Sequence, residues 1–184
     1  MSAPVVTLPR YAELAIATNF SFLRGASHPE ELVATAISLK LAGVGIADRN
    51  SLAGVVRAHL FLRNNREQAG DFRVVTGARL VFRDGTPDIL AYPRDRDAYG
   101  RLTRLLTDGN RHAPKGECHL TRDDLFRYSG GQQLIVMDAG EPDDPNLIAK
   151  LADAAPDRIW LAASAGYGRN MRADLARRAA SPRR

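Results

Sequence analysis

The sequence has little cysteine and no long hydrophobic run. Its 184 residues include a single cysteine, Cys118, so neither an internal disulfide nor a zinc site built from several cysteines can form. No apolar stretch approaches the roughly 18 residues that span a bilayer, and the N-terminus lacks the basic start and apolar stretch of a secretory signal. These absences exclude a disulfide scaffold, argue against membrane spanning and secretion, and predict a cytoplasmic protein with no membrane partner.

The composition is that of a globular protein, but the charge is unevenly placed. Hydrophobic residues make up 45% and charged residues 26% of the chain, enough for a folded domain with a core. The net charge is +5. Residues 1–164 carry 20 basic and 20 acidic side chains, whereas residues 165–184 carry six arginines and one aspartate. The sequence therefore predicts a neutral folded body and a basic tail.

Apolar patterns along the chain predict strands that alternate with helices. A capping box of Ser27 and Glu30 marks the start of the first helix, and Thr121 with Asp124 marks the start of a later one. Such alternation predicts an α/β fold with a mostly parallel sheet, open or closed into a barrel. The expected strands are 13–18, 44–47, 73–82, 88–92, 133–137 and 158–162, with helices from 27, 51, 95, 121 and 146 between them.

The last segment differs in character from the rest. After residue 163 there are almost no large apolar residues, so we expect a lead-in over 1–10, a folded domain over 11–163 and an arginine-rich tail over 164–184. The tail arginines could contact nucleic-acid phosphates without sequence preference, and a solvated charged end is the alternative. The candidate phosphate contacts are Arg169, Arg172, Arg177 and Arg178.

Four blocks of sequence carry a family resemblance. They are YAELAIATNFSFLRGASHPEELV, GIADRNSLAGVVRAH, ILAYPRDRDAYGRLTRLLT and KGECHLTRDDL, in this order along the chain. Together they resemble the N-terminal polymerase and histidinol phosphatase (PHP) domain of bacterial error-prone DNA polymerases, which are family C enzymes of the DNA polymerase III alpha-subunit type. The resemblance implies a distorted (β/α) barrel of PHP type. We expect the barrel to be incomplete and marginally stable, and the chain to be truncated, because a later block of the family would lie beyond the last strand.

The resemblance also implies where metal ligands would lie. Metal-binding members use histidines and carboxylates at strand ends to hold up to three metals for phosphoester hydrolysis. Here Ala15 and Ala17 occupy the positions of a His-x-His pair, Asp48 is kept, Arg49 replaces a histidine and Arg79 replaces a glutamate. We expect a degenerate site with no multinuclear metal centre, no cofactor and no catalytic residue in this chain.

Two groups of side chains leave alternatives open. Asp48 is either a surviving metal ligand or a structural carboxylate paired with Arg49, Arg79 or Asn50, and we favour the structural role because a lone carboxylate holds Mg²⁺ poorly. The run 117–119, Glu-Cys-His, contains capable metal ligands, but adjacent residues rarely converge on one ion. We interpret it as part of a shaped loop.

The family implies a role in a larger enzyme. Its polymerases extend primers with Mg²⁺ held by carboxylates of a palm domain, in DNA replication and repair, translesion synthesis and damage-induced mutagenesis. A chain of 184 residues ends before such a domain, so we expect a structural module packed against the remainder of a family C polymerase or its mutasome partners, reaching DNA through that polymerase. The alternatives are a stand-alone metal-dependent PHP phosphoesterase and a small nucleic-acid-binding module that uses the tail.

Overall fold

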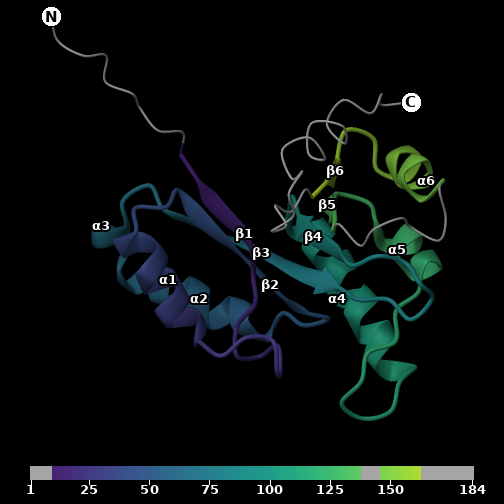
Figure 1. The fold of residues 1–184 in the computed structure, drawn as a ribbon, viewed down its shortest axis with the longest axis horizontal. Coiled ribbons are helices and arrows are strands. Elements are labelled where there is room, and N and C mark those ends of the chain that lie inside the picture. Colours follow the sequence, from purple (N-terminus) through teal and green to yellow (C-terminus); the bar gives the residue numbers. More distant parts are fainter. Residues whose placement is uncertain (1–9, 138–145, 163–184) are drawn as a thin grey trace, which may run out of the picture. The chain divides into compact units, whose positions relative to one another are not determined.

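The chain folds into two compact units that divide at Arg79 and Leu80. The computed structural model describes residues 10–137 and 146–162 (Figure 1). The predicted tail, with Arg169, Arg172, Arg177 and Arg178, lies outside the described residues. Among the residues that the structure does describe, no helix has the length and apolar character needed to cross a membrane.

The first unit is a run of parallel strands connected by helices. Its elements are β1 (Ala12–Ile16), α1 (Pro29–Ser38), β2 (Gly43–Arg49), α2 (Ala53–Asn64), the single turn α3 (Arg66–Ala69) and β3 (Arg73–Leu80). β2 pairs in parallel with both β1 and β3. This confirms the predicted alternation and parallel pairing, and it places the carboxyl ends of all three strands at one edge.

An apolar cluster packs the helices of this unit against its strands. Val44 and Ile46 of β2 are fully buried against Val33 of α1 and Ala58 of α2, and Figure 1 shows both helices along the same side of the strands. Alternate residues of a strand share a face, so Val44 and Ile46 face the helices together. β2 is buried at every position from Gly43 to Asp48, so its other face is covered as well, which explains a near-continuous apolar run instead of a strict alternation.

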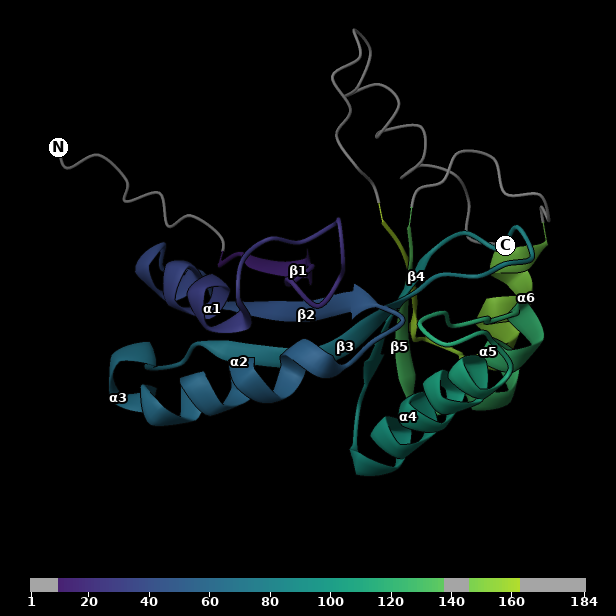
Figure 2. The ribbon, with the colours of Figure 1, turned by 90° about the horizontal axis from the view of Figure 1, so that it is seen from below.

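The second unit combines an antiparallel and a parallel strand pair. It contains β4 (Ile89–Pro93), α4 (Arg96–Arg111), α5 (Arg122–Tyr128), β5 (Gln132–Val136), α6 (Leu147–Ala154) and β6 (Ile159–Leu161). β5 runs antiparallel to β4 and parallel to β6. The antiparallel pair arises where two helices, α4 and α5, return the chain to the end at which β4 finished, and all three helices lie on one side of these strands (Figure 2). The α/β class is confirmed.

The helix starts follow local capping, with one correction. α5 begins as predicted, because the Thr121 N–H donates to Asp124 Oδ2 at 3.0 Å and the Asp124 N–H donates to Thr121 Oγ1 at 3.4 Å. The capping box predicted for α1 is wrong by one residue. His28 is the N-cap, and its N–H donates to Glu31 Oε2 at 2.8 Å. Pro29 then occupies the first helical position, which its fixed φ favours.

Candidate functional site

The candidate site lies at the carboxyl ends of β1, β2 and β3, where the sequence places the counterparts of metal ligands. Asp48 is the last buried residue of β2, and its side chain is fully buried. Its register partner on β3 is Ala78, so no second carboxylate stands opposite it there. A buried carboxylate needs hydrogen-bond donors to replace lost water, so its partners define what it does.

Two hydroxyl residues of the segment after β1 supply those donors. Thr18 donates its backbone N–H to Asp48 Oδ1 at 2.8 Å and its hydroxyl to Oδ2 at 2.8 Å. The Ser21 hydroxyl donates to Asp48 Oδ1 at 2.7 Å. Thr18 and Ser21 are themselves buried. Both carboxylate oxygens are therefore committed to hydrogen bonds within the chain.

The same hydroxyls accept bonds from the backbone around them. Ser21 Oγ accepts the N–H of Arg49 at 2.9 Å, and Thr18 Oγ1 accepts the N–H of Phe20 at 3.2 Å. Each hydroxyl thus donates to the carboxylate and accepts from an amide, which fixes its orientation. The result is a closed network that ties the β1–α1 loop, defined here as residues 17–28, to the end of β2.

Close packing leaves little room around Asp48. Gly54, in the first turn of α2, approaches the carboxylate so closely that a Cβ atom there would lie 2.6 Å from Asp48 Oδ2 and 2.8 Å from Thr18 Oγ1. Gly25 makes a similar approach within the loop, where a Cβ atom would lie 2.2 Å from the Thr18 carbonyl oxygen. Glycine at both positions allows the network to close.

The other predicted positions surround this network without adding a ligand. Ala15 is exposed and lies within an irregularity of the β1–β2 register, and Ala17 is half-buried at the start of the loop. Arg49 is exposed and Arg79 is half-buried, and the two are register partners at the ends of β2 and β3. Thr18 and Ser21 were not predicted as site residues. The signal that could have found them is a pair of hydroxyl residues three apart, directly after the strand that neighbours Asp48.

In the second unit, the side chains of the Glu-Cys-His run at 117–119 point in different directions. The His119 Nδ1 atom lies 3.1 Å from Arg83 Nη1, and His119 Nε2 lies 2.8 Å from Glu117 Oε2. Because arginine only donates, Nδ1 accepts and Nε2 carries the proton in the tautomer that this network implies. Cys118 turns to the Leu106 carbonyl instead. Across residues 10–137 and 146–162, no three His, Cys, Asp or Glu side chains lie close enough to share a metal ion.

Burial makes Cys118 a poor nucleophile. It raises the pKa of the Cys118 thiol, and the sulfur packs so closely on Gly109 that a Cβ atom there would lie 2.8 Å from it. We expect Cys118 to react with a disulfide reagent at pH 8 several-fold more slowly than free cysteine, measured by release of the coloured thiolate. Full reactivity in the native chain, with no further gain in denaturant, would contradict this prediction.

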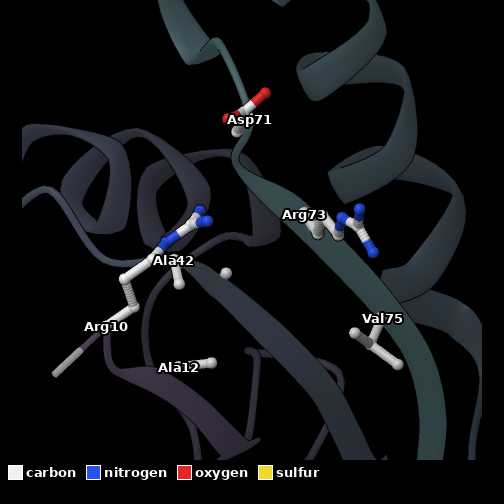
Figure 3. A pocket seen from close by; sticks show the side chains of 7 residues that line it. Arg10, Ala12, Ala42, Asp71, Arg73 and Val75 are labelled. Carbon is white, nitrogen blue, oxygen red and sulfur yellow. The ribbon is translucent and has the colours of Figure 1, made fainter.

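A shallow pocket lies at the opposite edge, where the strands begin. It is lined by Arg10, Asp71 and Arg73, with smaller residues beneath them (Figure 3). All three charged residues are exposed, and their charges are of both signs. Exposed charges of mixed sign are largely screened by solvent, so this edge defines no particular ligand.

Comparisons with known proteins place the chain in a family. Residues 13–168 match the PHP domain, and the chain belongs to the PHP domain family. It is similar to solved structures of that kind: a protein from Bifidobacterium adolescentis described as a metal-dependent phosphoesterase superposes with a TM-score of 0.67 at 14% identity, over 93% of this chain and 83% of that one. This likeness confirms the PHP-type α/β fold.

Relatives with higher sequence identity show which kind of PHP domain this chain resembles. The error-prone DNA polymerase of Brucella abortus is 55% identical over 155 residues, and that of Caulobacter vibrioides is 52% identical over 161 residues. These matches cover 83% and 86% of this chain, but the chain spans 14% of the length of either relative. The resemblance to the PHP domain of bacterial error-prone DNA polymerases is thereby confirmed.

Proposed function

We propose that this chain is the PHP module of an error-prone DNA polymerase and that the module is structural rather than hydrolytic. The high identity to segments of such polymerases supports the first part. The observation that carries the second part is the state of Asp48, whose two oxygens already accept hydrogen bonds from Thr18 and Ser21. A carboxylate that anchors a loop is not available as an open metal ligand.

The metal cluster that the fold family implies does not fit these residues. Ala15 and Ala17 offer no side-chain ligand atom, and Arg79 brings a cation to the edge where a metal would lie. A cation at Asp48 would have to displace the hydrogen bonds from Thr18 and Ser21 and would be repelled by nearby arginines. We therefore derive no hydrolytic step for this chain.

In the proposed polymerase, nucleotide transfer belongs to another part of the enzyme. That reaction uses Mg²⁺, and its DNA substrate would be held by the polymerase as a whole. The PHP module would supply a stable packing partner for the remaining domains and for mutasome partners. Translesion synthesis and damage-induced mutagenesis are the processes we propose for the whole enzyme.

A chimeric polymerase tests the proposed function. In the chimera, this chain replaces the matching segment of the Brucella abortus relative, and we expect Mg²⁺-dependent primer extension on intact and lesion-containing templates. The 184-residue chain alone is the control and should extend no primer. A chimera that folds but extends no primer, beside an active parent enzyme, would overturn the proposal.

Metal analysis tests the non-hydrolytic part separately. We expect the chain, purified without chelator, to hold substoichiometric metal and to leave bis(p-nitrophenyl) phosphate intact when Zn²⁺, Mn²⁺ or Mg²⁺ is added. A metal-binding PHP phosphoesterase in the same assay serves as the positive control. Stoichiometric metal together with metal-dependent hydrolysis would instead establish the stand-alone phosphoesterase.

A further inference from the structure

The β1–α1 loop presents an apolar tip to solvent. Phe22 is 84% exposed and Leu23 is 88% exposed, the two highest values among the exposed large hydrophobic residues of the described chain. Phe20, two residues earlier, is 40% exposed. Contiguous exposed apolar groups of this kind mark contact surfaces more often than single exposed residues do.

The tip is held in one conformation by hydrogen bonds on both sides. The Asn19 N–H donates to the Ser27 carbonyl at 3.0 Å, which closes the loop at its base. The Arg24 and Gly25 N–H groups donate to the Ser21 carbonyl at 2.9 and 3.0 Å. Ser21 also donates to buried Asp48, so the carboxylate fixes the loop from below.

Leu23 adopts a backbone conformation that a branched side chain disfavours. Its φ is +60°, in the left-handed region that glycine or asparagine normally occupies. Strained backbone persists only where the surroundings over-determine it, and it concentrates at binding and switch segments. Here the surroundings are the hydrogen bonds of the loop, and their effect is to turn Leu23 into solvent.

We propose that this tip, Phe22 and Leu23, docks into an apolar pocket with an acidic rim on the polymerase part of the enzyme. The proposal rests on the proposed function, because the relatives extend far beyond the 14% of their length that this chain spans. Charge supports the acidic rim: Arg24 is the one Lys, Arg, Asp or Glu residue in the β1–α1 loop. Exposed Arg49 is tied to the loop through the hydrogen bond from its backbone N–H to Ser21 Oγ. A protein partner fits better than single-stranded nucleic acid, because the aliphatic Leu23 cannot stack on a base.

Site-specific crosslinking in the chimera tests the docking. A photoreactive benzoyl-phenylalanine is placed at position 22, and the matched control carries it at Val56, which is 60% exposed on α2. We expect position 22 to crosslink to polymerase peptides outside this chain, at a yield several-fold above that of position 56. Equal yields, crosslinks to a second copy of this chain, or crosslinks to primer-template DNA would overturn the proposal.

Serine variants provide a second measurement that does not depend on crosslinking. Phe22→Ser with Leu23→Ser should leave the unfolding midpoint of the 184-residue chain unchanged, yet shorten the thermal half-life of primer extension by the chimera several-fold. Leu39→Ser with Val56→Ser, at exposed positions outside the loop, is the control for both assays. An unchanged half-life in the active chimera would refute the docking alone, whereas an inactive chimera with the native tip would refute the proposed function.

Discussion

Replacing Asp48 with alanine is expected to lower the free energy of unfolding by about 3 kcal/mol or more. The substitution would leave three buried donors without their acceptor: the Thr18 N–H, the Thr18 hydroxyl and the Ser21 hydroxyl. An unsatisfied buried donor costs about 1–3 kcal/mol, and hydrogen bonds to a charged acceptor are among the stronger ones. Urea unfolding of the 184-residue chain, followed by circular dichroism, measures the change.

Two further variants serve as comparisons. One removes the negative charge of Asp48 but keeps an acceptor oxygen, and the other removes an exposed carboxylate instead of a buried one. Asp48→Asn keeps one acceptor oxygen, so we expect a smaller loss of about 1–2 kcal/mol. Asp71→Ala removes an exposed carboxylate and should change stability by less than about 0.5 kcal/mol. If Asp48→Ala costs no more than Asp71→Ala, Asp48 does not anchor the loop. A loss of bound metal in Asp48→Ala would revive the ligand interpretation.

Much of the fold could be predicted because its signals are local. The strand predicted at 133–137 is β5 at Gln132–Val136, and the helix predicted from Thr121 and Asp124 is α5. Apolar periodicity and caps three residues apart involve neighbouring residues only. Such features can be recognised without knowing which elements pack together.

The start of α1 shows where local signals fail. Ser27 with Glu30 and His28 with Glu31 have the same spacing, so the capping pattern does not choose between them. The choice depends on Pro29 at the first helical position and on Glu30, whose Oε1 accepts from Arg57 Nε of α2 at 2.6 Å. That ion pair joins residues far apart in the sequence, so the sequence pattern cannot reveal it.

The position of the candidate site could be predicted from the sequence, but the hydrogen-bond partners of Asp48 could not. The strand pattern placed Asp48 at the end of β2, and Arg49, Arg79 or Asn50 was expected to be its partner. The hydrogen bonds instead come from Thr18 and Ser21, 30 and 27 residues earlier in the chain. Serine and threonine are common in loops, so their role here emerges only from the parallel pairing of β1 with β2.

This arrangement explains how one edge of a PHP fold can serve packing instead of hydrolysis. In the proposed function, the carboxylate that a metal would otherwise share holds the β1–α1 loop in place. The loop in turn presents the exposed side chains of Phe22 and Leu23, which we propose the polymerase part of the enzyme buries. Stability at Asp48 and docking at the tip are therefore coupled, and weakening the first should impair the second.

Gly54→Ala tests the same network from the helix side and should destabilise the chain by about 1–3 kcal/mol. At an unhindered helical position glycine to alanine ordinarily stabilises, by up to about 0.8–1.0 kcal/mol in a helix interior, because alanine loses less backbone entropy. At Gly54 the new methyl group would lie 2.6 Å from Asp48 Oδ2, so the carboxylate or α2 would have to move. We therefore expect the sign of the usual effect to reverse.

Gly100→Ala is the matched control within α4. Apart from the neighbouring backbone of α4 itself, no heavy atom of the described residues lies within 4 Å of the position that its Cβ would take. The full entropic gain of the substitution should therefore be measurable. Thermal or urea unfolding of both variants should move the midpoints in opposite directions. If Gly54→Ala stabilised the chain as Gly100→Ala does, the Asp48 carboxylate would be free to shift. A movable carboxylate could not fix the β1–α1 loop, and the structural interpretation of the site would fail.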